Sequence, residues 1–214
     1  MGYKTFVSLN IAVIGEGRKV ISLAKRLANV GHSICIGWKD AGAKDQKIMG
    51  RRLGDCISFA QITDAAADAD VIIICAAASD VREIAYLLDD VRRKVIVDST
   101  FVMPKALDEN INTINAITAI TGSPFVVKSF NCAGYQNIID PLFKGQSVDS
   151  FVAGNSIKAK EVVKILARDL GYSNCYDFGN DTTIPLLEEM AKCWHNLSQR
   201  ANVTRKVEKV VVKK

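Results

Sequence analysis

Histidine is scarce in this chain of 214 residues, which contains two, and its six cysteines include no C-x-x-C pair. Neither histidine has the spacing of a metal-ligand set, so the sequence predicts no metal site. Two of the cysteines, Cys35 and Cys75, lie inside apolar runs. We therefore expect the cysteines to be reduced residues of the core and not metal ligands.

Long apolar runs are absent too. No run approaches the roughly 18 to 20 residues that a membrane-spanning helix needs. The N-terminal stretch leads into an apolar segment without the small-residue cleavage site of a signal peptide. Hydrophobic residues make up 49% of the chain, which is enough to bury a sizeable core. The expected protein is globular and cytoplasmic, with no membrane partner.

The net positive charge comes from one end of the chain. The formal net charge is +5, and from residue 200 onward six basic residues face one acidic residue, Glu208, so six minus one accounts for the whole excess. A neutral body argues against a footprint for a nucleic-acid backbone. Residues 201–214 are interpreted as a basic solvated tail, or, because four valines fall close together there, as a last edge strand.

Side chains arranged for acid–base or nucleophilic catalysis are also missing. The sequence presents no plausible catalytic triad, no paired carboxylates and no activated nucleophile. Hydride transfer needs no such group if the acceptor supplies its own protonation site, because positioning then dominates the rate. This absence is therefore compatible with an oxidoreductase.

Short apolar runs alternate with amphipathic, helix-length segments along the chain. The runs that read as strands are 10–15, 33–38, 71–76, 94–99, 124–130, 150–155 and 175–179. Strands without polar alternation require a sheet covered on both faces, which predicts a Rossmann-like, doubly wound and mostly parallel α/β sheet. We expect a dinucleotide-binding domain over 1–147 and a small C-terminal α/β unit over 148–214 that packs on it.

A glycine turn follows the first of these runs. Gly15 and Gly17 have the G-x-G spacing of a dinucleotide fingerprint, while Val20 stands where the third glycine is usual. The backbone amides of Gly17, Arg18 and Lys19 would open a helix and face an anion. The turn therefore predicts dinucleotide binding, the alternative being a glycine turn in an α/β domain of another purpose.

The end of the second strand indicates which dinucleotide is bound. An acidic residue there accepts the ribose hydroxyls of NAD, whereas a basic residue meets the 2′-phosphate of NADP. Lys39 has the position of a phosphate partner, Trp38 is placed to stack on adenine, and Asp40 is the feature that would favour NAD. We expect NADP, with NAD the less favoured cofactor.

The ends of the later strands reach the same edge of the sheet, where ligands lie in this fold. Ala76 and Ala77 are small enough to let a ribose or nicotinamide approach the backbone. Thr100 and Asn131 offer polar contacts, unless they are structural turn residues. The nicotinamide is expected at this edge.

The succession of these segments resembles one protein family. "IAVIGEG", "LAKRLANVGHSICIGWKD", "ADADVIIICA" with "VIVDST", and "VVKSFN" follow one another as in the NADP oxidoreductases that depend on the deazaflavin coenzyme F420, which are related to the nucleotide-binding part of pyrroline-5-carboxylate reductase. The resemblance continues through "FVAGNSIKAKEVVKILARDLGY" and "FGNDTTIPLLEEMAKCWHNL" and so covers nearly the whole chain. It implies the same fold, an NADP cofactor and hydride transfer.

The resemblance also implies roles for single residues. Those that match the family's phosphate loop are Gly15, Gly17, Arg18 and Lys19. Lys39 takes the place of an arginine that binds the 2′-phosphate. The strand end that contacts the dinucleotide is matched by Cys75, Ala76 and Ala77, and the segment beside the nicotinamide by Asn131, Cys132 and Ala133.

Together these features predict an NADP-dependent oxidoreductase that moves a hydride between nicotinamide and a flavin-like (deazaflavin) or small carbonyl or imine acceptor. Two alternatives stay open: a dinucleotide-binding redox sensor or partner module without turnover, and a scaffold that has lost the nucleotide. A homodimer is expected if the last helix and the valine-rich tail need cover.

Overall fold

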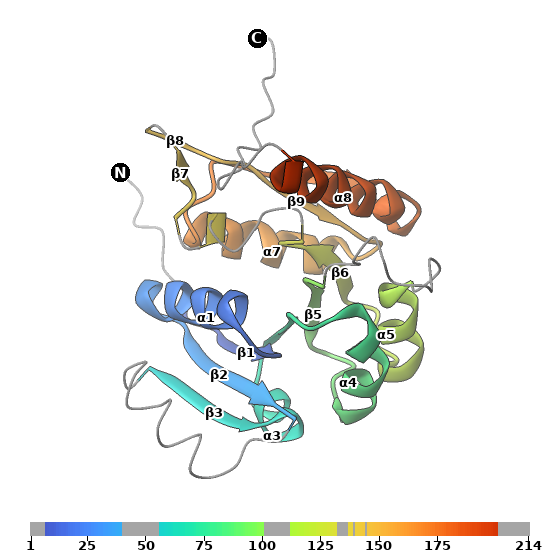
Figure 1. Cartoon of the computed structure of the whole chain (residues 1–214). Coiled ribbons are helices and arrows are strands. Elements are labelled where there is room, and N and C mark those ends of the chain that lie inside the picture. Colours follow the sequence, from blue (N-terminus) through green and yellow to red (C-terminus); the bar gives the residue numbers. More distant parts are fainter. Residues whose placement is uncertain are drawn as a thin grey trace.

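The computed structural model describes residues 7–39, 56–100, 112–131, 137–138, 140–143 and 145–200. Its centre is an eight-stranded sheet in the order β10-β9-β6-β5-β4-β1-β2-β3, with helices on both faces (Figure 1). The strands of this sheet are β1 Asn10–Ile14, β2 Ser33–Trp38, β3 Ile57–Gln61, β4 Val71–Ile74, β5 Val95–Asp98, β6 Val126–Ser129, β9 Ser150–Ala153 and β10 Cys175–Gly179. The predicted Rossmann-like, mostly parallel α/β fold is confirmed.

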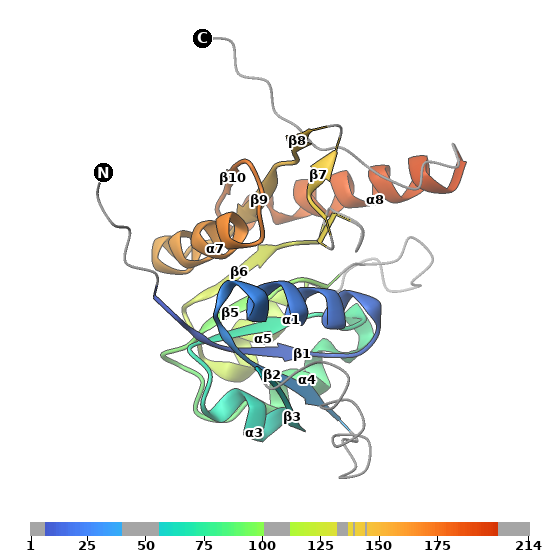
Figure 2. The same cartoon turned by 90° about the vertical axis from the view of Figure 1, so that its left-hand side faces the viewer.

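The helices form two layers, one on each face of the sheet (Figure 2). One core cluster joins the sheet to α1 Arg18–Val30 and α7 Ile157–Asp169. The other joins it to α3 Ile62–Ala67, α4 Val81–Leu87, α5 Thr113–Thr121 and α8 Ile184–Arg200. Short 3-10 turns at Ala78–Asp80 and Asp181–Thr183 lead into α4 and α8.

Strand β1 illustrates why the strands read as continuous apolar runs. Ile11 and Val13 enter the cluster under α1, whereas Ala12 and Ile14 enter the cluster on the other face. All four are at most 1% exposed. A central strand buried on both sides has no position left for a solvent-facing residue, so polar alternation is lost.

Among the strands of the main sheet and the α-helices that cover it, β3, α3 and α5 were not predicted. Strand β3, "ISFAQ", is short and alternates with polar residues because it forms an edge of the sheet. Helix α5, "TINAITAIT", is rich in β-branched residues that favour strands. Its start is fixed instead by Asn112, whose side chain accepts a hydrogen bond from the Asn115 N–H, and its end by Gly122 in the left-handed conformation.

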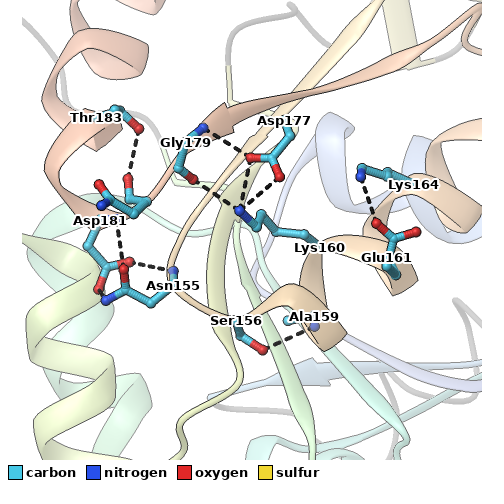
Figure 3. Close-up of polar contacts among 11 residues, drawn as sticks. Asn155, Ser156, Ala159, Lys160, Glu161, Lys164, Asp177, Gly179, Asp181 and Thr183 are labelled. Atoms are coloured by element: carbon cyan, nitrogen blue, oxygen red, sulfur yellow. Dashed lines mark hydrogen bonds and ion pairs between the residues drawn. The ribbon is translucent and has the colours of Figure 1, made fainter.

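The C-terminal strands extend the main sheet. β9 pairs with β6 in the antiparallel direction, and β10 pairs with β9 in parallel. The end of β9 is tied to the turn before α8, since Asn155 and Asp181 exchange hydrogen bonds, and Lys160 on α7 contacts Asp177 on β10 (Figure 3). The division at residue 147 into two domains stays a prediction, and the strands on its two sides share one sheet.

Three further expectations concern the cysteines, the C-terminal tail and membrane-spanning helices. Cys75 is buried as expected, but Cys56 and Cys193 are exposed, so the cysteines are not all core residues. The basic tail 201–214 lies outside the described residues. Among the helices that the structure describes, none is long and apolar enough to cross a membrane. The remaining β7 Leu142–Phe143 and β8 Gln146–Ser147 form a separate two-stranded ladder.

Candidate functional site

The turn after β1 lies against the end of β4, the strand next to it in the sheet. Gly15 has a φ of +129°, and its N–H donates to the carbonyl of Gly37 at 3.1 Å. A Cβ atom on Gly15 would lie 2.5 Å from the carbonyl oxygen of Cys75. Glycine is required here because the two strand ends approach each other more closely than a side chain allows.

Helix α1 begins directly after this turn with an open N-terminus. Gly17 is its N-cap, with a φ of +89° and no side-chain cap hydrogen bond, and a Cβ atom there would meet nothing within 4 Å. The first N–H groups of a helix lack partners inside the helix and carry the positive end of its dipole. The geometry therefore suits an anion such as a pyrophosphate. Val20, at the third fingerprint position, is fully buried in the core beneath the helix.

A pocket of about 470 Å³ opens beside this turn, at the ends of β1, β2 and β4. It brings together residues that the sequence predicted from three separate motifs: Gly15, Trp38, Lys39, Cys75, Ala76 and Ala77. The sequence reasoning missed the opposite wall, which comes from α3 and α4 and the turn between β4 and α4. That wall includes Ile62, Asp80, Glu83, Ile84 and Leu87.

The end of β2 is held by its neighbour β3. The side-chain amide of Gln61, with its nitrogen turned toward β2, donates to the carbonyl oxygens of Lys39 at 2.8 Å and Trp38 at 3.3 Å. The Trp38 ring packs edge-on against Phe59, with ring centroids 5.3 Å apart. Lys39 extends to α4, where its Nζ lies 2.6 Å from Oε1 of Glu83. The predicted 2′-phosphate partner is thus a pocket residue already paired with a carboxylate.

Other predicted site residues lie outside this pocket. Arg18 is exposed at the first turn of α1, and the Lys19 ammonium donates to the carbonyl of Ser99 at the end of β5. Thr100 is fully buried and Asn131 is 6% exposed, so neither presents an open polar surface. Cys132 and Ala133 lie outside the described residues. The roles assigned to all these residues stay predictions.

Burial shapes the chemistry of the one thiol among the described residues that line the pocket. Desolvation raises the pKa of the Cys75 thiol, and the Lys19 ammonium and the Ser99 side chain offset this effect only in part. A thiol with a raised pKa is protonated at neutral pH and is a weak nucleophile. Cys75 therefore acts as a small wall residue, consistent with chemistry that needs no protein nucleophile.

A buried charge network lies beneath the ends of β5 and β6, and the sequence reasoning missed it. Lys128 on β6 is 0% exposed. Its Nζ lies 3.0 Å from Oδ2 of Asp98 on β5 and 3.1 Å from Oγ1 of Thr100, and it also contacts Oε1 of Glu188 on α8. The available signal was a lysine inside the apolar run 124–130, a position where a charge must find a buried partner.

The two carboxylates keep this lysine charged. Burial alone would lower the pKa of Lys128, but Asp98 and Glu188 outweigh it and raise that pKa above its ordinary value. Burial likewise opposes ionisation of Asp98, yet the Lys128 ammonium and hydrogen bonds from Thr113 and Thr100 hold the pKa of Asp98 below its ordinary value. Asp98 and Lys128 are therefore both ionised at neutral pH.

Comparison with known proteins agrees with this geometry. The sequence profile of the family described as NADP oxidoreductase, coenzyme F420-dependent, matches residues 10–101. No curated protein sequence matches the chain. A crystal structure of a protein provisionally described as an F420-dependent NADP reductase, from Arthrobacter sp. FB24, is 24% identical, with a TM-score of 0.82 over 96% of this chain and 100% of its own.

Two further solved structures share the fold. A hypothetical protein from Sinorhizobium meliloti is 20% identical, with a TM-score of 0.70 over 99% of this chain and 98% of its own. An imine reductase from Aspergillus terreus, crystallised with NADPH4 and dibenz[c,e]azepine, is 14% identical, with a TM-score of 0.67 over 92% of this chain. This chain spans 64% of the length of that enzyme.

The matched segment contains β1 to β5, the glycine turn and every described residue that lines the pocket. The predicted resemblance is confirmed over this segment. The predicted enzyme class, NAD(P)-dependent oxidoreductase, is also the class of the family that matches. Over residues 10–101 the chain is thus similar to the NADP oxidoreductase, coenzyme F420-dependent family.

Proposed function

We propose that this protein is an NADP-dependent oxidoreductase that transfers a hydride between nicotinamide and a flavin-like or small carbonyl or imine acceptor. The observation that carries the proposal is that the glycine turn and Lys39 line one pocket at the point where the strand order reverses, and that the open N-terminus of α1 follows the turn directly. In open α/β sheets this crevice is where ligands bind.

The residues present fit a dinucleotide. Gly15 lets β1 turn against β4, and Gly17 leaves open the space through which a pyrophosphate would approach the first N–H groups of α1. The pocket, between the end of β2 and α4, would take the adenosine end, with Lys39 beside the 2′-phosphate. Ala76 and Ala77 would let the dinucleotide pass along the strand ends.

The bound cofactor would supply the hydride chemistry, and the protein would position it. No residue of the pocket wall acts as a nucleophile in this proposal, since Cys75 stays protonated. The acceptor would approach the strand ends of β5 and β6, where Lys19 crosses from α1 to Ser99. The acceptor class rests on the family's description and on the imine reductase with the same fold.

The test is a calorimetric titration of the protein with NADPH and, separately, with NADH. We expect NADPH to bind more tightly, and we expect Lys39→Ala to weaken NADPH by about tenfold or more while leaving NADH nearly unchanged, because a charge-assisted contact to the 2′-phosphate is worth about 1.5 to 3 kcal/mol. Failure of the wild-type protein to bind either dinucleotide would contradict the proposal.

Turnover distinguishes an enzyme from a redox sensor that only binds the cofactor. The wild-type protein with NADPH is offered an oxidised deazaflavin, a flavin, and a panel of carbonyl and imine compounds, and absorbance at the nicotinamide band is followed. The reverse direction is tested with NADP+ and a reduced deazaflavin. Oxidation of NADPH by one class would identify the acceptor. Tight binding without turnover across the whole panel would favour the sensor.

We also propose a cytoplasmic homodimer that forms through the outer face of α8. Leu186 and Leu197 are 62% and 53% exposed, and they lie on one face with Met190 and Cys193 at helical spacing. Light scattering is expected to give twice the mass of one chain. Leu186→Glu should return the mass of a monomer, and a monomeric wild-type protein would contradict the proposal.

A further inference from the structure

The pocket beside the glycine turn carries more negative than positive charge. Its described lining includes three carboxylates, on Glu16, Asp80 and Glu83, and one ammonium, on Lys39. A site that serves only to bind a 2′-phosphate is expected to have more positive than negative side chains, because the phosphate carries about 1.5 to 2 negative charges at pH 7. The acidic side chains therefore need an explanation of their own.

Glu83 is the carboxylate placed to interfere with Lys39. The two side chains come from different elements, the end of β2 and helix α4, and meet at 2.6 Å with 55% of each exposed. A pair this exposed is worth little, so a ligand separates it at small cost. Once separated, the Glu83 carboxylate stays in the pocket wall near any phosphate bound by Lys39.

We propose that Glu83 is a specificity-determining residue that competes with the 2′-phosphate for Lys39 and so reduces the preference for NADPH over NADH. This inference rests on the proposed function of the same pocket. The 2′-phosphate of NADPH must displace the Glu83 carboxylate from Lys39, and the displaced carboxylate then repels it. The 2′-hydroxyl of NADH is neutral and can donate a hydrogen bond to a carboxylate, so NADH meets neither cost.

The experiment is a titration of Glu83→Gln with NADPH and with NADH. Glutamine keeps the shape of the side chain and removes its charge. We expect the ratio of the NADH to the NADPH dissociation constant to rise about fivefold, mainly through tighter NADPH binding. The gain should fall toward unity at about 1 M salt, where the screening length is about 3 Å.

A matched control is available on α7. Glu161 and Lys164 form an exposed pair of the same 2.6 Å length outside the pocket (Figure 3). Glu161→Gln removes the same charge from the molecule and should leave the ratio unchanged. A change in this control equal to that in Glu83→Gln would mean that net charge alone is responsible, and it would overturn the inference.

The outcomes separate the inference from the function on which it rests. If the wild-type protein binds neither dinucleotide, the proposed function fails. If the wild-type protein binds NADPH, and Glu83→Gln leaves the ratio unchanged or lowers it, the function stands and the role of Glu83 is wrong. Lys39→Ala combined with Glu83→Gln should show a smaller effect of the glutamine than the single variant, since the competition for Lys39 is then absent.

Discussion

Replacing Lys128 with methionine is expected to lower the free energy of unfolding by about 3 to 5 kcal/mol, because it leaves two carboxylates without their cation. Asp98 is 0% exposed and Glu188 is 9% exposed, so solvent compensates only weakly for the missing lysine. Methionine fills most of the same volume, so the loss measures the missing charge and not a cavity. Urea unfolding followed by circular dichroism gives the difference.

A second lysine provides the matched control for this change. Lys164 on α7 is paired with Glu161, but both side chains are partly exposed to solvent. Lys164→Met should change the free energy of unfolding by less than about 1 kcal/mol. Adding Asp98→Asn and Glu188→Gln to Lys128→Met should recover part of the loss. A loss below about 1 kcal/mol in Lys128→Met itself would mean that the buried charge network contributes little to the stability of the protein.

Gly15→Ala is expected to have the largest effect on cofactor binding. The new Cβ atom would lie 2.5 Å from the Cys75 carbonyl oxygen, and a φ of +129° is strained for alanine. The ends of β1 and β4 must separate, which moves the start of α1 away from the pyrophosphate position. We expect NADPH affinity to fall more than tenfold, which corresponds to about 1.4 kcal/mol or more, and stability to fall by about 1 to 3 kcal/mol.

Gly145→Ala is the control that distinguishes the effect of backbone strain from the effect of the close approach between the ends of β1 and β4. Gly145 also has a positive φ, +78°, but a Cβ atom there would meet nothing within 4 Å, and it lies in the turn between β7 and β8, outside the pocket. Gly145→Ala should therefore cost some stability and leave NADPH affinity unchanged. Normal NADPH binding by a folded Gly15→Ala protein would show that the glycine turn is not part of the site.

The sequence sufficed for the parts of the fold and pocket that local patterns determine. A G-x-G pair after an apolar run predicts the turn at Gly15, since the conformation needs glycine wherever the rest of the chain lies. In the same way, the apolar run 33–38 predicted where the second strand ends, and therefore that Lys39 lies at this end. The short edge strand β3 and helix α5 were missed because tertiary contacts outweigh their weak local preferences.

Contacts between distant segments could not be predicted in this way. Glu83 lies on α4, and nothing near it in the sequence indicates that α4 brings it to Lys39. Glu188 lies beside the apolar stripe of its helix and reads as a surface residue until Lys128 is placed below it. Lysine in an apolar strand signalled a buried charge, but its partners depend on which strands and helices become neighbours.

The Lys128 network also bears on how the chain folds. A fragment that stopped at residue 147 would keep Lys128 and Asp98 but would lack β9, β10 and Glu188. Strand β6 would then be an unprotected sheet edge, next to a lysine that had lost one of its two counter-charges. The strands on the two sides of residue 147 therefore depend on each other for their stability, and they should unfold together in one cooperative transition.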